Sequence, residues 1–136
     1  MRLAVTICLA LLSVQNAAPR MRTIDKGTQS GIEEARTVVV RTADEWQKLW
    51  RAHAAGKPVP AVDFSQEMVV GVFAGQRPTA GYSVEIVGIR DENGGLVVDY
   101  RSGSPTRDAI TAQVLTAPYD LVAVPKRAGE VRFEPR

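Results

Sequence analysis

The chain has 136 residues, the usual length of one domain, and 45% of them are hydrophobic, as in an ordinary globular protein rather than a disordered one. Its formal net charge is +2, from 17 basic and 15 acidic residues that are interspersed along the chain. Domains that bind nucleic acid more often cluster their Lys and Arg with aromatic residues. We therefore expect no nucleic-acid partner.

The beginning of the chain has the three-part layout of a secretory signal peptide. Arg2 gives a positive start, residues 3–14 form an apolar run, and the small residues Ala17 and Ala18 follow. The apolar run is too short to cross a bilayer as a helix. We therefore expect residues 1–18 to be removed, the mature chain to be exported to the periplasm or the extracellular space, and no stable membrane span to remain.

Cysteine and histidine usage restricts the chemistry of the mature chain. Cys8 is the sole cysteine, and it lies in the segment that we expect to be removed. A mature chain without thiols suits an oxidising compartment and leaves the fold to depend on its core. With His53 as the sole histidine, no zinc site of usual composition can form. We expect neither a metal nor a cofactor.

Residues 19–34 are polar and lack periodicity, so they predict a flexible lead-in to a single domain over residues 35–136. The domain begins with a strand predicted within residues 35–42, where residues 37–40 are β-branched. It continues with a helix predicted over about residues 43–55.

The helix is the best-defined element of the sequence. Thr42 and Glu45 have the spacing of a capping box. Four residues then follow the i, i+3, i+4, i+7 spacing of one helix face: Trp46, Leu49, Trp50 and His53. This periodicity predicts that His53 lies at the boundary of the core and is not part of a catalytic Ser-His-Asp site.

The rest of the chain predicts strands joined by short turns. Residues 67–74 are almost continuously hydrophobic, as in a central strand covered on both faces, and residues 82–89 alternate. Asn93-Gly94 predicts a hairpin, because both central residues of that turn need positive φ. Further strands are predicted at residues 96–101, 109–115, 119–124 and 131–133. The predicted fold is therefore α+β, a mostly antiparallel sheet of six or seven strands with one amphipathic helix packed on it.

The loop between the two strong strands is the most distinctive segment. Pro78 fixes φ and Gly81 can adopt positive φ. Arg77 and Tyr82 are residue types enriched at binding hot spots. The loop is either a recognition element or a structural turn in which Tyr82 belongs to the core. The candidate partner-binding residues are Gln76, Arg77, Pro78, Thr79, Gly81 and Tyr82.

No motif predicts an enzyme. Residues 81–85 begin like a nucleophile elbow, but they lack the closing glycine and enter a predicted strand instead of a helix. We therefore expect no catalytic activity. A carboxylate acid–base pair, and binding of a small ligand or polysaccharide by exposed aromatic residues, are the alternatives from other classes of function.

The order of these segments resembles the C-terminal domain of the PrcB family of bacterial protease-complex subunits. The resemblance runs over about residues 68–133 and includes the strand 68–73, the turn 75–82, the strand 83–89 and the later residues 116–126. It implies an exported accessory protein that supports or stabilises a secreted protease and has no catalytic activity of its own. It implies a protein partner and leaves the oligomeric state open.

A second likeness concerns the loop alone. Residues 77–82, Arg-Pro-Thr-Ala-Gly-Tyr, are similar to the Asn-Pro-Thr-Thr-Gly-aromatic loop of chagasin-type inhibitors of cysteine proteases. Arg77 and Ala80 depart from that pattern, and the Arg-Pro-Trp loop of those inhibitors is missing. The likeness implies, as the alternative function, a protease inhibitor that uses the 77–82 loop.

Overall fold

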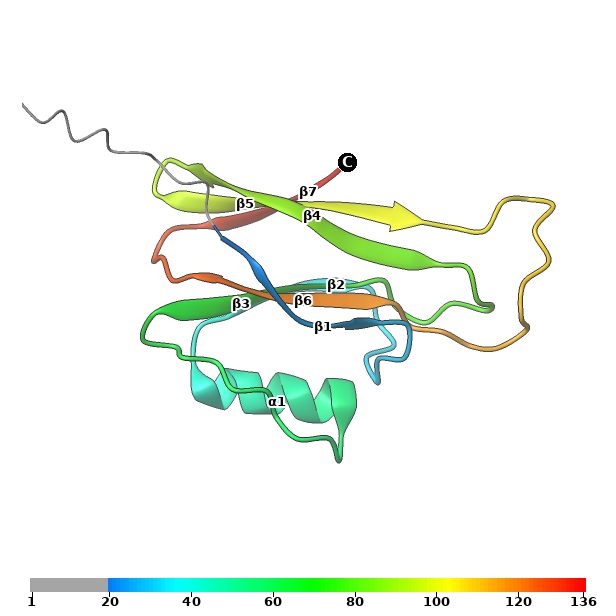
Figure 1. The fold of residues 1–136 in the computed structure, drawn as a ribbon, viewed down its shortest axis with the longest axis horizontal. Coiled ribbons are helices and arrows are strands. Elements are labelled where there is room, and N and C mark those ends of the chain that lie inside the picture. Colours follow the sequence, from blue (N-terminus) through cyan, green and yellow to red (C-terminus); the bar gives the residue numbers. More distant parts are fainter. Residues whose placement is uncertain (1–19) are drawn as a thin grey trace, which may run out of the picture.

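A helix, a four-stranded sheet and a three-stranded sheet form three layers, as Figure 1 shows. The computed structural model describes residues 20–136, so the predicted signal peptide at residues 1–18 lies outside the described residues. The elements are β1 (Arg22–Gly27), β2 (Arg36–Val40), α1 (Ala43–Ala54), β3 (Glu67–Phe73), β4 (Ser83–Glu92), β5 (Gly95–Gly103), β6 (Tyr119–Pro125) and β7 (Val131–Pro135). The predicted α+β class is confirmed.

The four-stranded sheet is the middle layer. Its strands lie in the order β1-β6-β3-β2, and every neighbouring pair is antiparallel. Val69 of β3 packs in the core on the helix side, whereas Val70 packs in the core on the side of the other sheet. This burial on both faces confirms the prediction of a central strand from residues 67–74, since alternate residues of a strand point to opposite faces.

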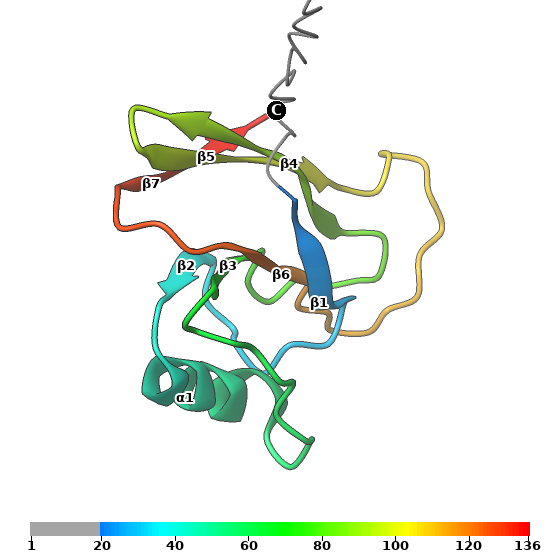
Figure 2. The ribbon, with the colours of Figure 1, turned by 60° about the vertical axis from the view of Figure 1, so that its left-hand side comes forward.

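The three-stranded sheet has the order β4-β5-β7 and covers the second face of the middle layer (Figure 2). The predicted hairpin joins β4 to β5, with φ of 50° at Asn93 and 77° at Gly94. β7 pairs with β5 in parallel. The prediction of one sheet is therefore wrong: Val84 and Ile86 of β4 bury their side chains against the middle layer instead of extending it.

Helix α1 packs on the first face of the middle layer and begins as predicted. Thr42 Oγ1 accepts a hydrogen bond from the Glu45 amide at 3.2 Å. Glu45 Oε2 accepts from the Arg41 amide at 3.3 Å, one residue before the cap. The predicted face of Trp46, Leu49, Trp50 and His53 is buried. Both indoles also donate 3.0 Å hydrogen bonds to carbonyls of the loop that follows the helix, which holds that loop against it.

Two predicted segments differ from the structure. Residues 19–34 were expected to be a flexible lead-in, but Arg22–Gly27 form β1, which pairs with β6. This strand has a single apolar side chain, Ile24, and a bulge between Thr23 and Asp25, so its sequence lacks the alternation that indicates a strand. The prediction of a strand at residues 109–115 is wrong, because these residues belong to a long loop between β5 and β6.

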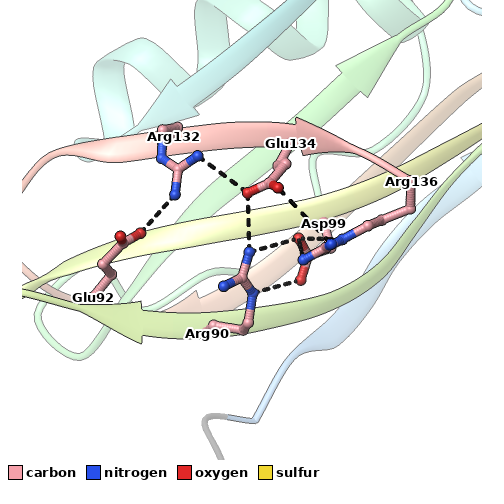
Figure 3. A network of polar contacts seen from close by, with 6 residues as sticks. All are labelled: Arg90, Glu92, Asp99, Arg132, Glu134 and Arg136. Atoms are coloured by element: carbon pink, nitrogen blue, oxygen red, sulfur yellow. Dashed lines mark hydrogen bonds and ion pairs between the residues drawn. The ribbon is translucent and has the colours of Figure 1, made fainter.

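The outer face of the three-stranded sheet carries a network of ion pairs, shown in Figure 3. Asp99 accepts hydrogen bonds from Arg90 at 2.9 Å and from Arg136 at 3.0 Å. The hydrogen bond from Arg90, followed by that from Arg136, lowers the pKa of Asp99 below its ordinary value despite the opposing effect of burial. Arg90 and Arg132 also pair with Glu134. The arginine side chains on this face are thus neutralised by neighbouring carboxylates.

Among residues 20–136, no helix has both the length and the apolar composition needed to cross a membrane. Within that range there is also no group of three or more His, Cys, Asp or Glu side chains placed to hold a metal ion.

Candidate functional site

The loop from β3 to β4, residues 74–82, lies at one end of the fold, at the right of Figure 1. Gly75 has φ of 80° and Gly81 has φ of 94°, so the predicted positive φ of Gly81 is confirmed. A Cβ atom on Gly75 would lie 2.7 Å from the Ala35 nitrogen, and one on Gly81 would lie 2.8 Å from Pro105 Cγ. Both glycines therefore serve the backbone conformation and the close packing of this loop.

A second loop, residues 104–116 between β5 and β6, runs beside the first. Arg77 and Thr116 exchange two backbone hydrogen bonds, of 2.6 and 3.0 Å. The Ala80 amide donates to the Ala112 carbonyl at 3.0 Å, and Thr116 Oγ1 donates to the Thr79 carbonyl at 2.8 Å. These bonds hold the two loops together. We call residues 74–82 and 104–116 the two-loop tip.

The second loop presents apolar side chains to solvent. Ile110 is fully exposed, Leu115 is 61% exposed and Val114 is 50% exposed. Loops of this length without secondary structure are uncommon in compact domains and are often functional. Apolar side chains gathered on an exposed segment are typical of a surface that another molecule covers. Residues 104–116 are therefore the strongest candidate for a contact surface in the described part of the chain.

A hollow of about 300 Å³ lies beneath the first loop, at the end of the gap between the two sheets. Arg77 and Tyr82 line it, and the Arg77 guanidinium lies 5.5 Å from the centre of the Tyr82 ring. Arg36, at the start of β2, also lines it and lies 6.0 Å from the centre of the Phe73 ring. None of the ion pairs among residues 20–136 includes either arginine. Their charges are thus available to an anionic group.

The predicted site residues divide into two groups. Gln76 and Thr79 fix the loop through their backbones, because the Gln76 amide donates to the Glu33 carbonyl at 2.8 Å and the Thr79 carbonyl accepts from Thr116. Gly81 has the backbone role described above. The side chains of Arg77 and Pro78 are exposed, and that of Tyr82 is half-buried beside the hollow. The loop thus combines a structural backbone with side chains that a partner can reach.

Sequence reasoning missed the second half of this site. Residues 109–115 contain Ile110, Val114 and Leu115, and we predicted a strand there. An exposed apolar loop and a half-buried strand can have the same composition. The length of the connection between the last hairpin strand and β6 was the signal that could have distinguished them.

His53 takes part in a separate hydrogen-bond chain that sequence reasoning also missed. His53 Nε2 lies 2.9 Å from Asp25 Oδ2, and Nδ1 lies 2.8 Å from Ser30 Oγ. Ser30 Oγ also accepts a hydrogen bond from the Ile32 amide at 3.0 Å, so this hydroxyl connects the His53 ring to the backbone of the segment after β1. Asp25 and Ser30 come from the segment that we expected to be a flexible lead-in.

The surroundings of this chain are enclosed. The His53 side chain is 1% exposed, and its ring lies 4.2 Å from that of Tyr119 and 5.2 Å from that of Trp50, measured between centroids. Burial, together with a hydrogen bond to Asp25, raises the pKa of the Tyr119 hydroxyl. The arrangement joins α1 and the segment after β1 to the middle sheet, of which β1 is an edge strand, so it stabilises the packing of the helix on the sheet.

Asp120 of β6 is the other buried polar group of note. Its Oδ2 accepts from the Ile86 amide at 2.8 Å, which links the middle sheet to β4. Its Oδ1 has no hydrogen-bond partner among residues 20–136. Burial raises the pKa of Asp120 above its ordinary value.

The two-loop tip lies within a segment of the chain that matches the model of a known protein family. The family model described as PrcB C-terminal matches residues 68–125, which extend from β3 to the end of β6 and include both loops of the tip. No curated protein and no solved structure matches the chain. The resemblance of this segment to the PrcB C-terminal domain, predicted from the order of its strands and turns, is therefore confirmed.

Proposed function

We propose that the protein is an exported, non-catalytic accessory module that binds a partner protein through the two-loop tip. The observation that carries this proposal is the exposure of Ile110, Val114 and Leu115 on a loop fixed by hydrogen bonds to residues 77–80. Complete burial of one such side chain in an interface is favourable by about 1.5–3 kcal/mol. Three of them can form the apolar centre of a binding surface, with Arg77 at its edge.

The hydrogen bonds between the two loops favour binding in a second way. A loop that is ordered before it binds loses less conformational freedom in the complex than a loop that is ordered by the partner. The exchanged backbone bonds of Arg77 and Thr116, and the bond from Thr116 to Thr79, order both loops in the free protein. The apolar side chains are thus presented on a prepared surface.

A secreted protease is the class of partner that we propose. The match of residues 68–125 to the PrcB C-terminal family model supports this class, because the resemblance to that family implies a protease-complex partner. The apolar run at residues 3–14, with the small residues after it, supports export. In this role the module stabilises the protease or assists its assembly.

Direct inhibition by the 77–82 loop is the second candidate function. The exposed side chains of Arg77 and Pro78 favour it, because a protease cleft could receive them. An assay of papain-like proteases with the purified domain at micromolar concentrations distinguishes the two. Loss of protease activity supports inhibition, whereas full activity with retained binding supports the accessory role.

Affinity purification of the tagged protein from its native cells tests the proposal. Ile110→Asp places a charge on the proposed surface, and Val59→Asp is its matched control, since Val59 is 46% exposed in the loop after α1. We expect a secreted protease to be recovered with the wild-type protein and with Val59→Asp, but not with Ile110→Asp. Equal recovery with all three proteins would show that the tip is not the binding surface.

A further inference from the structure

The free edge of β2 is a second surface with the properties of a binding site. We propose that this edge binds an extended segment of a partner protein as an added strand, and that the segment carries an acidic residue. β2 is an outer strand, because the sheet order is β1-β6-β3-β2. The inference goes beyond the two-loop tip, and its test does not depend on the tip.

The backbone groups of Thr37 and Val39 point toward the open side of β2. The Ala74 amide, directly after β3, donates a 2.9 Å hydrogen bond to the carbonyl that precedes β6. Backbone groups alternate in direction along a strand, so those of Phe73 point the other way, toward β2. Arg36 lies opposite Phe73, so the backbone groups of Arg36 and of every second residue after Arg36 form the hydrogen bonds to β3. Thr37 and Val39 are left with two N–H and two C=O groups facing outward.

The other three edge strands are protected against added strands, and β2 is not. β1 and β4 each contain a bulge. β7 carries Arg132 and Glu134 and ends in Pro135. Bulges, charges and proline are the devices by which edge strands avoid pairing with other chains. β2 instead pairs with β3 in unbroken register and has no charge within residues 37–40.

A groove accompanies this edge. It has a volume of about 390 Å³ and lies between β2 and α1, where Val38 and Val40 meet Leu49 and Ala52. Alternate side chains of an added strand point to opposite faces of the sheet, so every second side chain would enter the groove. Main-chain hydrogen bonds together with such pockets are the basis of peptide recognition by strand addition.

The charges around the groove indicate the chemistry of the segment. Arg36 and Lys48 line it, and neither belongs to an ion pair among residues 20–136. Glu45 also lines it, but its Oε2 accepts the hydrogen bond of the Arg41 amide at the start of α1. The groove therefore offers two unpaired cations, which complement an acidic side chain in the bound strand.

Two synthetic peptides test this inference with the purified domain. Each has about seven residues, the usual length of a strand, and alternates valine with threonine. One carries glutamate at both ends and the other lysine. We expect the glutamate peptide to shift the NMR amide signals of residues 37–40 and to bind about fivefold more tightly than the lysine peptide, as one or two exposed ion pairs would produce. Equal affinities, or shifts confined to other strands, would overturn the inference.

Matched variants test the strand and the charge separately. Val39→Pro removes an outward N–H and should abolish binding, whereas Val87→Pro, in the bulge of edge strand β4, should not change it. Lys48→Glu should weaken binding of the glutamate peptide about fivefold, whereas Arg51→Glu, on the same helix but outside the groove, should not. Unchanged binding by both Val39→Pro and Lys48→Glu would overturn the inference. A concentration-dependent dimer of the domain that Val39→Pro dissociates would overturn it in favour of self-pairing.

Discussion

Asp120 gives the sharpest test of the packing between the two sheets. The residue is 2% exposed, its Oδ2 is hydrogen-bonded to the Ile86 amide at 2.8 Å, and its Oδ1 has no partner among residues 20–136. A buried polar atom without a partner costs about 1–3 kcal/mol. Asp120→Asn keeps the shape and the acceptor for Ile86 but removes the buried charge.

The pH dependence of this substitution has a definite sign. Burial raises the pKa of Asp120 in the folded state above its ordinary value of 3.8. Between these two pKa values the folded state binds more protons than the unfolded state, so this group makes the wild-type protein less stable as the pH rises. Asp120→Asn lacks this titration. We therefore expect the free energy of unfolding of Asp120→Asn, minus that of the wild type, to increase as the pH rises above about 4.

Urea unfolding of both proteins at a series of pH values measures this difference. Carboxylates whose pKa is lowered, such as Asp99 and Glu92, contribute equally to the pH dependence of both proteins, so their contribution cancels in the difference. Asp120→Ala is the control. It lacks the same titration, so its difference from the wild type should change with pH in parallel with that of Asp120→Asn. Because it also leaves the Ile86 amide without an acceptor, it should be less stable than Asp120→Asn by about 1–3 kcal/mol at every pH. A difference between Asp120→Asn and wild type that is independent of pH, or that decreases as the pH rises, would refute the reasoning.

Three further substitutions test the helix, the histidine and the tip. Thr42→Ala removes the acceptor of the Glu45 amide and should lower the free energy of unfolding by about 1 kcal/mol in urea; an unchanged value would contradict the role of this cap. His53→Phe keeps an aromatic ring but removes both side-chain hydrogen bonds, so it should lower the free energy of unfolding by about 1–3 kcal/mol and speed amide hydrogen exchange in β1. Unaltered exchange in β1 would contradict the role of the hydrogen bond between His53 and Asp25. Arg77→Ala should change stability by less than about 0.5 kcal/mol while weakening partner binding; a large loss of stability with normal binding would make the loop structural.

Local signals in the sequence predicted the elements whose stability depends on nearby residues. The start of α1 follows from Thr42 and Glu45, and its buried face follows from a spacing of three and four residues. The hairpin at Asn93-Gly94 follows from the need for positive φ at two consecutive residues. Each of these inferences requires only residues within about two helical turns or one tight turn of each other.

The features that could not be predicted depend on partners distant in sequence. β1 contains a bulge and is held by β6 and by the bond from Asp25 to His53, which lies 28 residues away. The division into two sheets depends on which strands pair, and a strand's own residues do not specify its neighbour. The parallel pairing of β7 with β5 is an example, since β6 lies between them in the chain but in the other sheet.

The candidate site was predicted in part for the same reason. The composition of residues 76–82 indicated a stiff loop that is either a recognition element or a structural turn, and the structure shows Arg77 and Pro78 exposed. The second loop was mistaken for a strand because Ile110, Val114 and Leu115 have the composition of one. The hydrogen bonds that place it beside the first loop join residues more than 30 positions apart, as between Thr79 and Thr116.

Site-specific photo-cross-linking tests the central claim, that the two-loop tip binds a secreted protease, most directly. A photoreactive amino acid replaces Ile110 in one tagged protein and Val59 in a control, both of which are exposed apolar positions. After irradiation of native cells, adducts are purified under denaturing conditions and identified by mass spectrometry. We predict an adduct with a secreted protease from position 110 and none from position 59. No adduct at position 110, or the same adducts from both positions, would contradict the claim.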